Sequence, residues 1–225
     1  MSGTTRGPRP PPPLRKLPRG GRHALTRQAV AASQRARMLP AIVRVVADKG
    51  YSGTTVADII ALAGVSRRTF YEHFASVEAC FLAAYDDGLQ ALLAAVNDAL
   101  AGVPKDDWQA RSRAAVDAYL RALSAAPAGA AWAYTVEVLG AGRKALARRA
   151  AVLAQWVAQW RALQQARSAA DPAVRPVDDA TLLALVGGIE ELVRECLRTR
   201  NARQLPSLLD AATGLALRVL DGGAG

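Results

Sequence analysis

Residues 50–77, GYSGTTVADIIALAGVSRRTFYEHFASV, decide the fold, because they encode two short helices and the tight turn between them. Thr54 and Thr55 stand where a helix N-cap belongs, and the apolar residues that follow recur at the spacing of one buried helical face: Val56, Ile59, Ile60 and Ala63. Gly64 is predicted to end this helix, since glycine readily takes the left-handed conformation. Ser66 is then placed to cap the next helix.

The second helix of this stretch has two chemically different faces. Phe70 and Phe74 lie one turn apart and are predicted to pack on the first helix. The opposite face carries donors suited to base edges and phosphates: Arg67, Arg68, Thr69, Tyr71 and His73. A merely solvated face is the alternative, but the position of these donors favours a helix-turn-helix that binds DNA. Glu72 is ambiguous, because it can accept from cytosine or pair with an arginine.

A family resemblance is carried by ordered groups of residues: Gly50-Tyr51, Thr54-Thr55-Val56, Asp58-Ile59, Ala63-Gly64-Val65-Ser66 and Thr69-Phe70-Tyr71-Glu72-His73-Phe74. These groups resemble the DNA-binding domain of the tetracycline-repressor (TetR) family over roughly residues 35–85. The resemblance implies that Arg67, Arg68 and Thr69 approach bases. It implies phosphate contacts for Thr55, Ser66, Tyr71 and His73. Val77 departs from the family, in which many members have a phosphate-contacting lysine at this position, so that contact is expected to be weaker or supplied elsewhere.

The net charge of +10 is concentrated at one end of the 225-residue chain. Residues 1–50 hold eleven Lys and Arg against Asp48 alone, whereas basic and acidic residues balance over residues 51–225. A basic excess beside the helix-turn-helix favours a polyanionic partner. No apolar run reaches the roughly 18 to 20 residues of a membrane span, and the proline-rich N-terminus lacks the apolar core of a signal peptide. We therefore expect a soluble, cytoplasmic protein without a membrane partner.

Three domains are predicted: residues 1–25, 26–76 and 77–221. The first is a disordered, basic, proline-rich arm, because its composition cannot bury enough apolar area to order itself. Its cations are expected to contact DNA, although a PxxP ligand for a partner domain is the alternative: Arg15, Lys16, Arg19 and Arg22. The second domain begins with a helix from Thr26 to Lys49, which Pro40 is expected to kink or divide.

The third domain is predicted to be a larger helical bundle for effector binding and dimerisation. Its helices are expected at about residues 77–101, 106–126, 128–141, 144–168, 178–200 and 205–220. The last two are apolar on more than one face, which predicts that they pack both on their own core and on a second subunit. The candidate interface residues are Ile189, Leu192, Leu208 and Leu209.

Aromatic and polar side chains on these helices are candidates for an effector pocket, because the family resemblance implies that the helices enclose one: Tyr119, Trp132, Glu137, Trp156 and Trp160. Plain core packing is the alternative for any single aromatic residue. A buried Glu137 beside indoles would suit a cationic or hydroxyl-bearing apolar effector. The charged run on the penultimate helix, with Arg194 and Arg198 one turn from glutamates, is read as ion pairs.

Two other classes of protein compete with this interpretation. An enzyme is disfavoured because the chain has only His23 and His73, in the arm and the second short helix, and no catalytic motif, so no catalytic residue, cofactor or metal site is predicted. An architectural DNA binder is disfavoured by the size of the C-terminal half. The sequence thus predicts an all-α, homodimeric transcriptional regulator that binds double-stranded DNA. The favoured action is repression at a pseudo-palindromic operator, relieved by a small apolar effector.

Overall fold

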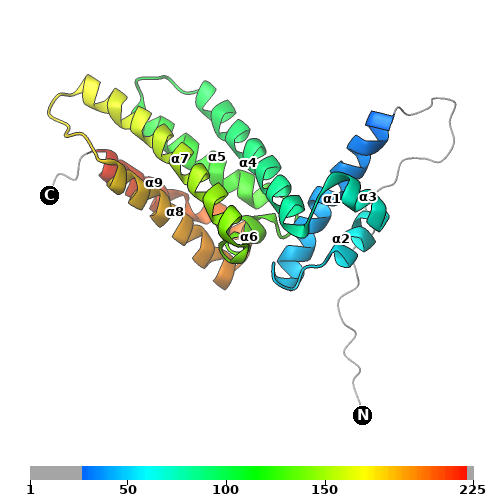
Figure 1. The fold of residues 1–225 in the computed structure, drawn as a ribbon. Helices are drawn as coiled ribbons and strands as arrows, with labels where there is room; N and C mark the ends of the chain where they lie inside the picture. The colour runs from blue at the N-terminus through cyan, green and yellow to red at the C-terminus, as the bar shows by residue number, and fades with distance from the viewer. Residues whose placement is uncertain (1–26, 222–225) are drawn as a thin grey trace, which may run out of the picture.

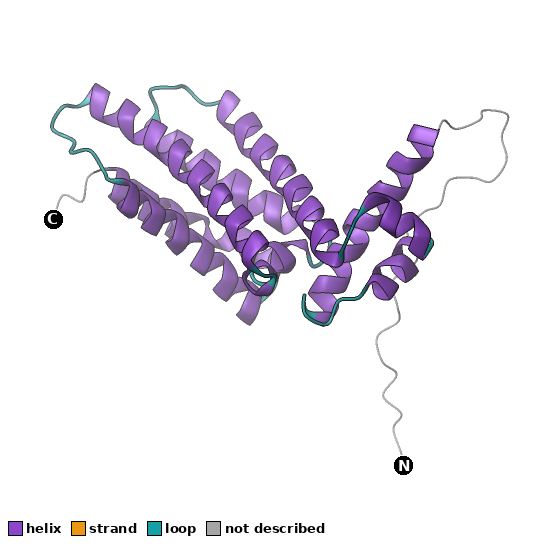
Figure 2. Cartoon of the chain, in the orientation of Figure 1, coloured by secondary structure: helices purple, strands orange, loops and turns teal. Residues whose placement is uncertain are grey.

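The computed structural model describes residues 27–221, which form helices without any strand (Figures 1 and 2). The N-terminal part contains α1 (Arg27–Lys49), α2 (Val56–Ala63) and α3 (Arg67–His73). The long helix α4 (Val77–Ala101) leads into a C-terminal bundle of α5 (Trp108–Ala125), α6 (Ala130–Thr135), η1 (Glu137–Gly140), α7 (Arg143–Ala170), α8 (Asp179–Thr199), η2 (Ala202–Leu208) and α9 (Leu209–Leu220). The predicted all-α class is confirmed, while the arm of residues 1–25 and its four cations lie outside the described residues.

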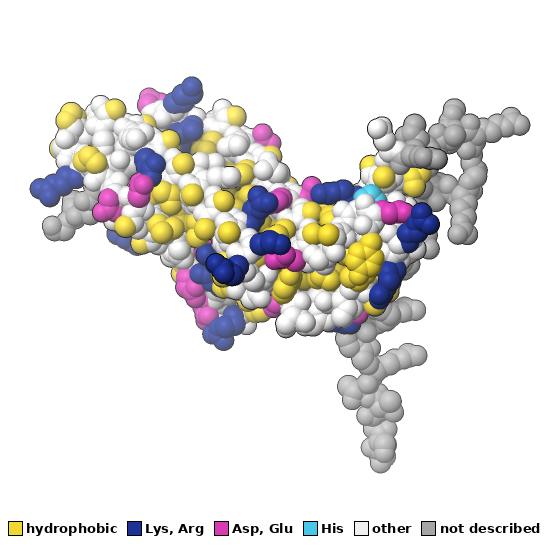
Figure 3. Space-filling model, in the orientation of Figure 1, with side chains coloured by type: hydrophobic (Ala, Val, Ile, Leu, Met, Phe, Trp, Pro, Cys, Tyr) yellow, Lys and Arg dark blue, Asp and Glu magenta, His cyan; other side chains and the backbone are white. Residues whose placement is uncertain are grey.

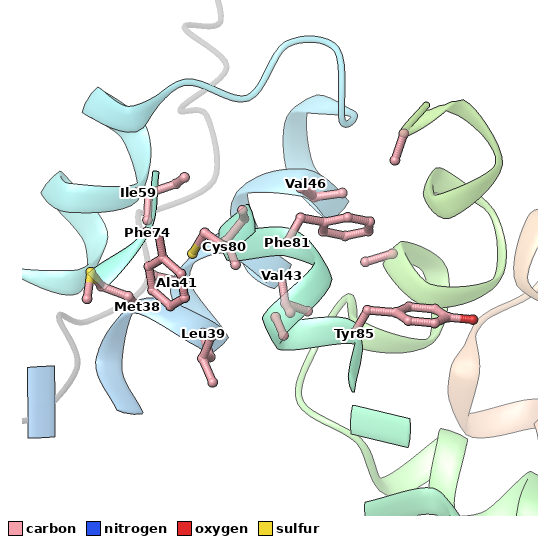
Figure 4. Close-up of a cluster of buried hydrophobic side chains, with 14 of the residues drawn as sticks. Met38, Leu39, Ala41, Val43, Val46, Ile59, Phe74, Cys80, Phe81 and Tyr85 are labelled. Carbon is pink, nitrogen blue, oxygen red and sulfur yellow. The ribbon is translucent and has the colours of Figure 1, made fainter. Parts of the chain in front are cut away.

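The N-terminal core is built from α1 to α4 and continues into the C-terminal bundle. Ile59, Phe70 and Phe81 are fully buried in it, and Phe74 and Tyr85 extend it on either side (Figure 4). The same cluster includes side chains of α6, η1 and the first turns of α7. The DNA-facing and C-terminal parts therefore share apolar surface rather than meeting through a linker.

Pro40 does not divide the first helix, which is continuous from Arg27 to Lys49. Proline removes one backbone donor and crowds the preceding turn, so its position costs helix stability. The residues on both sides of it, Met38, Leu39, Ala41 and Ile42, are buried in the core. Tertiary packing of this apolar face holds the helix together across the proline.

Helix α4 connects the two parts of the molecule and contacts α1, α5 and α7. Ser76 caps it as predicted, accepting from the Ala79 amide at 3.1 Å. By length and hydropathy α4 is also the one helix within residues 27–221 that could cross a membrane. The sequence prediction of no membrane-spanning run did not include it. Its buried residues, among them Phe81, Tyr85 and Val96, pack in the protein core, and we read α4 as a core helix.

The C-terminal bundle differs from the predicted elements at two places. The segment predicted as one helix over 128–141 is the six-residue helix α6 followed by the 3-10 segment η1. The helix predicted from Leu205 begins as the 3-10 segment η2, which contains Pro206, and becomes α-helical only at Leu209. Proline lacks the amide that a continuing α-helix needs, so the α-helix starts after it.

Candidate functional site

The turn between α2 and α3 is fixed by caps that the sequence indicates. Thr55 accepts from the Asp58 amide while Asp58 accepts from the Thr55 amide, which forms a capping box at the start of α2. Gly64 ends α2 in the left-handed region with φ of 63°. Ser66 then caps α3 by accepting from the Thr69 amide at 3.0 Å. These contacts set the angle at which α3 leaves the turn.

Two further contacts that sequence reasoning missed lock this unit to α1. Lys49 pairs with Asp58, and the hydrogen bonds from Lys49 and Thr55 lower the pKa of Asp58 to about 2. Arg37 donates to the carbonyl oxygens of Ala63 and Gly64 at 2.8 and 3.1 Å, at the open C-terminal end of α2. No local motif identifies Arg37, because its partners lie 26 and 27 residues away.

Helix α3 buries Phe70 in the core and leaves part of the predicted DNA-facing set exposed to solvent. Arg67, Arg68 and Tyr71 are exposed, and the Arg68 side chain is 90% exposed while it pairs with Glu72 at 3.0 Å. His73 is half-buried at 3.3 Å from the side-chain oxygen of Gln34. Basic side chains lie at the end of the molecule remote from the C-terminal bundle, and others are spread over the rest of the same face (Figure 3). Such a surface offers both guanidinium groups for bases and hydroxyl groups for phosphates.

A cavity of about 360 Å³, here called cavity 1, lies between α4, α5, α7 and α8. Three predicted pocket residues line it: Tyr119, Trp156 and Trp160. Lys105 and Arg111 also line it, and neither forms an ion pair with any residue of 27–221, although Arg111 donates to the carbonyl oxygens at the end of α4. Sequence reasoning missed these two cations, because they lie on the α4–α5 loop and the following helix. Cavity 1 therefore combines an apolar body with uncompensated positive charge.

A second cavity of about 400 Å³, here called cavity 2, lies nearer the DNA-binding end. Tyr119, Trp156 and Glu190 line both cavities and thus stand between them. The Tyr119 and Trp156 rings meet edge to face with centroids 5.8 Å apart. Glu190 is held by ion pairs with Arg149 and Arg194, so its charge is compensated. Burial, and then the neighbouring Glu190, raise the pKa of Tyr119, which keeps its hydroxyl protonated.

Trp132 and Glu137 lie outside the linings of both cavities, unlike the other predicted pocket residues. The Glu137 carboxylate accepts from the Trp132 indole at 3.0 Å and from the Tyr51 amide at 2.8 Å. Glu137 therefore joins η1 to the loop between α1 and α2. The argument for a cationic effector fails with this placement, because the carboxylate on which it rested faces the DNA-binding end instead of the cavity.

The four predicted interface residues are at least partly covered within a single chain. Ile189 is only 6% exposed and lines cavity 1, which is wrong for a side chain meant to face a second subunit. Leu192, Leu208 and Leu209 are half-buried against the core of the C-terminal bundle. The first part of α8 is apolar on most sides, so helical spacing alone does not distinguish its inner face from its outer one.

The ion pairs predicted on the penultimate helix are present on α8. Arg194 pairs with Glu190 and Glu191, and Arg198 pairs with Glu195. The sequence did not reveal that Glu190 also has Arg149 of α7 as a partner, which places this carboxylate between the two cavities.

Comparison with known proteins agrees with this architecture. Residues 39–84 match the family model described as bacterial regulatory proteins, tetR family. No curated protein sequence matches the chain. Among solved structures, FadR from Bacillus subtilis, in complex with stearoyl-CoA, is similar with a TM-score of 0.72 at 15% identity, covering 84% of this chain and 99% of that one.

Two more solved structures extend the comparison. The fatty acid degradation regulator FadR from Bacillus halodurans is similar with a TM-score of 0.71 at 17% identity, covering 82% of this chain and 94% of that one. A TetR transcriptional regulator from Chloroflexus aurantiacus J-10-FL has a TM-score of 0.62 at 25% identity, covering 84% and 96%. Residues 39–84 thus match the DNA-binding region of the tetR family of bacterial regulatory proteins, and the chain shares its fold with these solved regulators.

Proposed function

We propose that the chain is a cytoplasmic homodimeric repressor that leaves a pseudo-palindromic operator when an amphipathic small molecule with an anionic end enters cavity 1. The observation that carries this proposal is the combination of aromatic walls with two unpaired cations, Lys105 and Arg111, in that cavity. Arg111 is half-buried, and a half-buried cation without a counter-ion favours a ligand that brings one. Lys105 is exposed and adds positive charge at the same cavity. The proposal replaces the cationic effector that a buried Glu137 suggested.

The dimer is supported by the outward face of the first part of α8, the helix that packs beside α9 (Figure 1). Residues at helical spacing on this side of α8 are small or apolar, namely the exposed Ala180, Leu183 and Ala184 and the half-buried Gly187. A Cβ added at Gly187 would meet nothing within 4 Å, so the space outside its backbone is open. An uncharged face of small residues lets a second helix pair approach closely, and a two-fold axis there generates the symmetric pair of α3 helices that a pseudo-palindrome needs.

The effector class is supported by the shape of the lining. Trp156 is half-buried and offers apolar surface that a ligand can cover, and the buried Trp160 forms part of the same wall, while the cations lie at the α4–α5 end of the cavity. Bacillus subtilis FadR, which has a similar fold, was solved with stearoyl-CoA. An acyl thioester combines an apolar chain with anionic phosphates, and it therefore serves as the first probe of this chain.

Stearoyl-CoA should change the tryptophan emission of the purified protein and release it from operator DNA. Emission changes because the acyl chain alters the polarity of the cavity that both Trp156 and Trp160 line. Trp160→Phe should lose much of the emission change, whereas Trp132→Phe should retain it, because Trp132 lies outside both cavities. Fluorescence titration and DNA anisotropy measure the two effects. Release of DNA without any emission change in the wild type would place the effector elsewhere.

A further inference from the structure

Cavity 2 is distinguished from cavity 1 by a wall that belongs to the DNA-binding part. Leu39, Pro40 and Val43 of α1 line it on one side. Residues of α4, α5, α6 and α7 close the other sides. A ligand in this space would touch the helix that holds the helix-turn-helix, whereas cavity 1 has no lining residue from α1, α2 or α3.

The charges that line the two cavities differ in sign. Cavity 2 is lined by no Lys or Arg, and its two carboxylates are Asp87 and Glu190. Cavity 1 has Lys105 and Arg111 in addition to Glu190. An anionic end is therefore favoured in cavity 1 and disfavoured in cavity 2, which suits uncharged apolar atoms. This asymmetry fixes the direction in which an amphipathic molecule would lie.

The boundary between the cavities consists mainly of side chains. The Tyr119 and Trp156 rings touch at one edge, and the Tyr119 hydroxyl makes no hydrogen bond with any other residue in the described part of the chain. A ring without a polar anchor can change rotamer when an apolar chain pushes against it. Trp156 is half-buried and already faces both spaces.

The wall of cavity 2 is tied to the DNA-binding end at several points. Tyr134 of α6 lines the cavity and donates to the Ala84 carbonyl oxygen at 2.8 Å. Its ring lies so close to Gly88 that a Cβ there would come within 2.4 Å of it. Three residues beyond Tyr134, Glu137 accepts from the Tyr51 amide. Displacement of α6 would thus move a group that is hydrogen-bonded to the α1–α2 loop.

We propose that cavity 2 is a second, uncharged chamber that receives the far end of the apolar chain of an effector whose anionic end is held in cavity 1. The length of the apolar chain then decides whether DNA is released, because only a chain that passes Tyr119 and Trp156 reaches α1 and α6. This inference rests on the proposed function, since it assumes the amphipathic effector. It adds a separate site and a requirement for chain length.

A matched pair of variants on α5 separates the two chambers. Ala115 lines cavity 1 alone and Ala122 lines cavity 2 alone, two turns further along the same helix. Phenylalanine at either position fills the adjacent chamber. Calorimetry measures the binding of octanoyl-CoA and stearoyl-CoA, and anisotropy measures the release of operator DNA. The same measurements with octanoate and stearate show whether a carboxylate suffices as the anionic end. Melting curves check folding, and Ala122→Leu gives a milder filling if A122F unfolds.

Each buried methylene contributes about fourfold in affinity. The wild type should therefore bind stearoyl-CoA at least about 100-fold more tightly than octanoyl-CoA, and only stearoyl-CoA should release DNA at saturation. A122F should bind octanoyl-CoA within about twofold of wild type, should lose at least about tenfold in stearoyl-CoA affinity and should no longer respond to it. A115F should weaken both thioesters.

Failure of this inference is distinguishable from failure of the proposed function. If saturating octanoyl-CoA releases DNA as fully as stearoyl-CoA, or if A122F and A122L both keep the full stearoyl-CoA response, the second chamber is refuted while the effector class stands. If no thioester or fatty acid binds the wild type, both the proposed effector class and the proposed second chamber are refuted.

Discussion

Leu183→Glu should convert the dimer to monomers and reduce operator affinity by about 100-fold or more. In a dimer, binding of one half-site makes binding of the second an intramolecular step, and a monomer binds only one half-site. Leu183 is 47% exposed on the outward face of α8, so the substitution leaves the protomer core intact. In a dimer the new carboxylate would be desolvated without a partner. Sedimentation velocity measures the state of association, and anisotropy measures the affinity.

Leu146→Glu is the matched control for this experiment. Leu146 is 45% exposed and Leu183 is 47% exposed, but Leu146 lies on α7 and not on α8 or α9. We expect this variant to remain dimeric and to bind operator DNA as the wild type does. A dimeric L183E protein with unchanged operator affinity would refute the interface.

Arg68→Ala should cost about 1 to 3 kcal/mol of operator binding and relax the preference at one base pair. The side chain projects from the N-terminal turn of α3 and is 90% exposed, so its removal leaves the fold unchanged. A guanidinium reads guanine through two acceptors at once, and no other side chain on α3 replaces that geometry except Arg67. Affinity is measured on the operator and on random DNA at the same salt concentration.

Glu72→Gln is the control for Arg68, since it removes the ion pair and keeps the guanidinium. An exposed pair one turn apart contributes about 0.5 kcal/mol or less, so this variant should change operator affinity little. An equal loss on operator and random DNA in R68A would show that Arg68 contacts phosphate and reads no base.

The helix-turn-helix is predictable from sequence because its determinants are local. Thr55, Gly64 and Ser66 specify caps within four residues of themselves, and the structure has each of them as predicted. Two predictions that involve prolines differ from the structure, namely a first helix kinked or divided at Pro40 and a last helix that begins at Leu205. Packing on both sides overrides the proline in α1, whereas Pro206 delays the start of α9.

The C-terminal site is less predictable because its geometry depends on contacts distant in sequence. Trp156 and Trp160 line cavity 1 as predicted, but their helical spacing fits plain core packing equally well. Glu137 looked like a pocket group from its apolar neighbours, and its partner is an amide 86 residues away. Lys105 and Arg111 can be recognised as candidate ligand-binding residues only in the folded structure, where both line cavity 1.

Protection footprinting of the purified protein on its own chromosomal DNA tests the central claim most directly. A dimeric regulator should protect discrete promoter sites whose two half-sites are related by approximate two-fold symmetry, with centres about 34 to 36 Å or a multiple apart. Addition of stearoyl-CoA should remove that protection. Protection without sequence preference, or sites that no ligand of this class releases, would contradict a ligand-responsive repressor and favour an architectural DNA-binding protein.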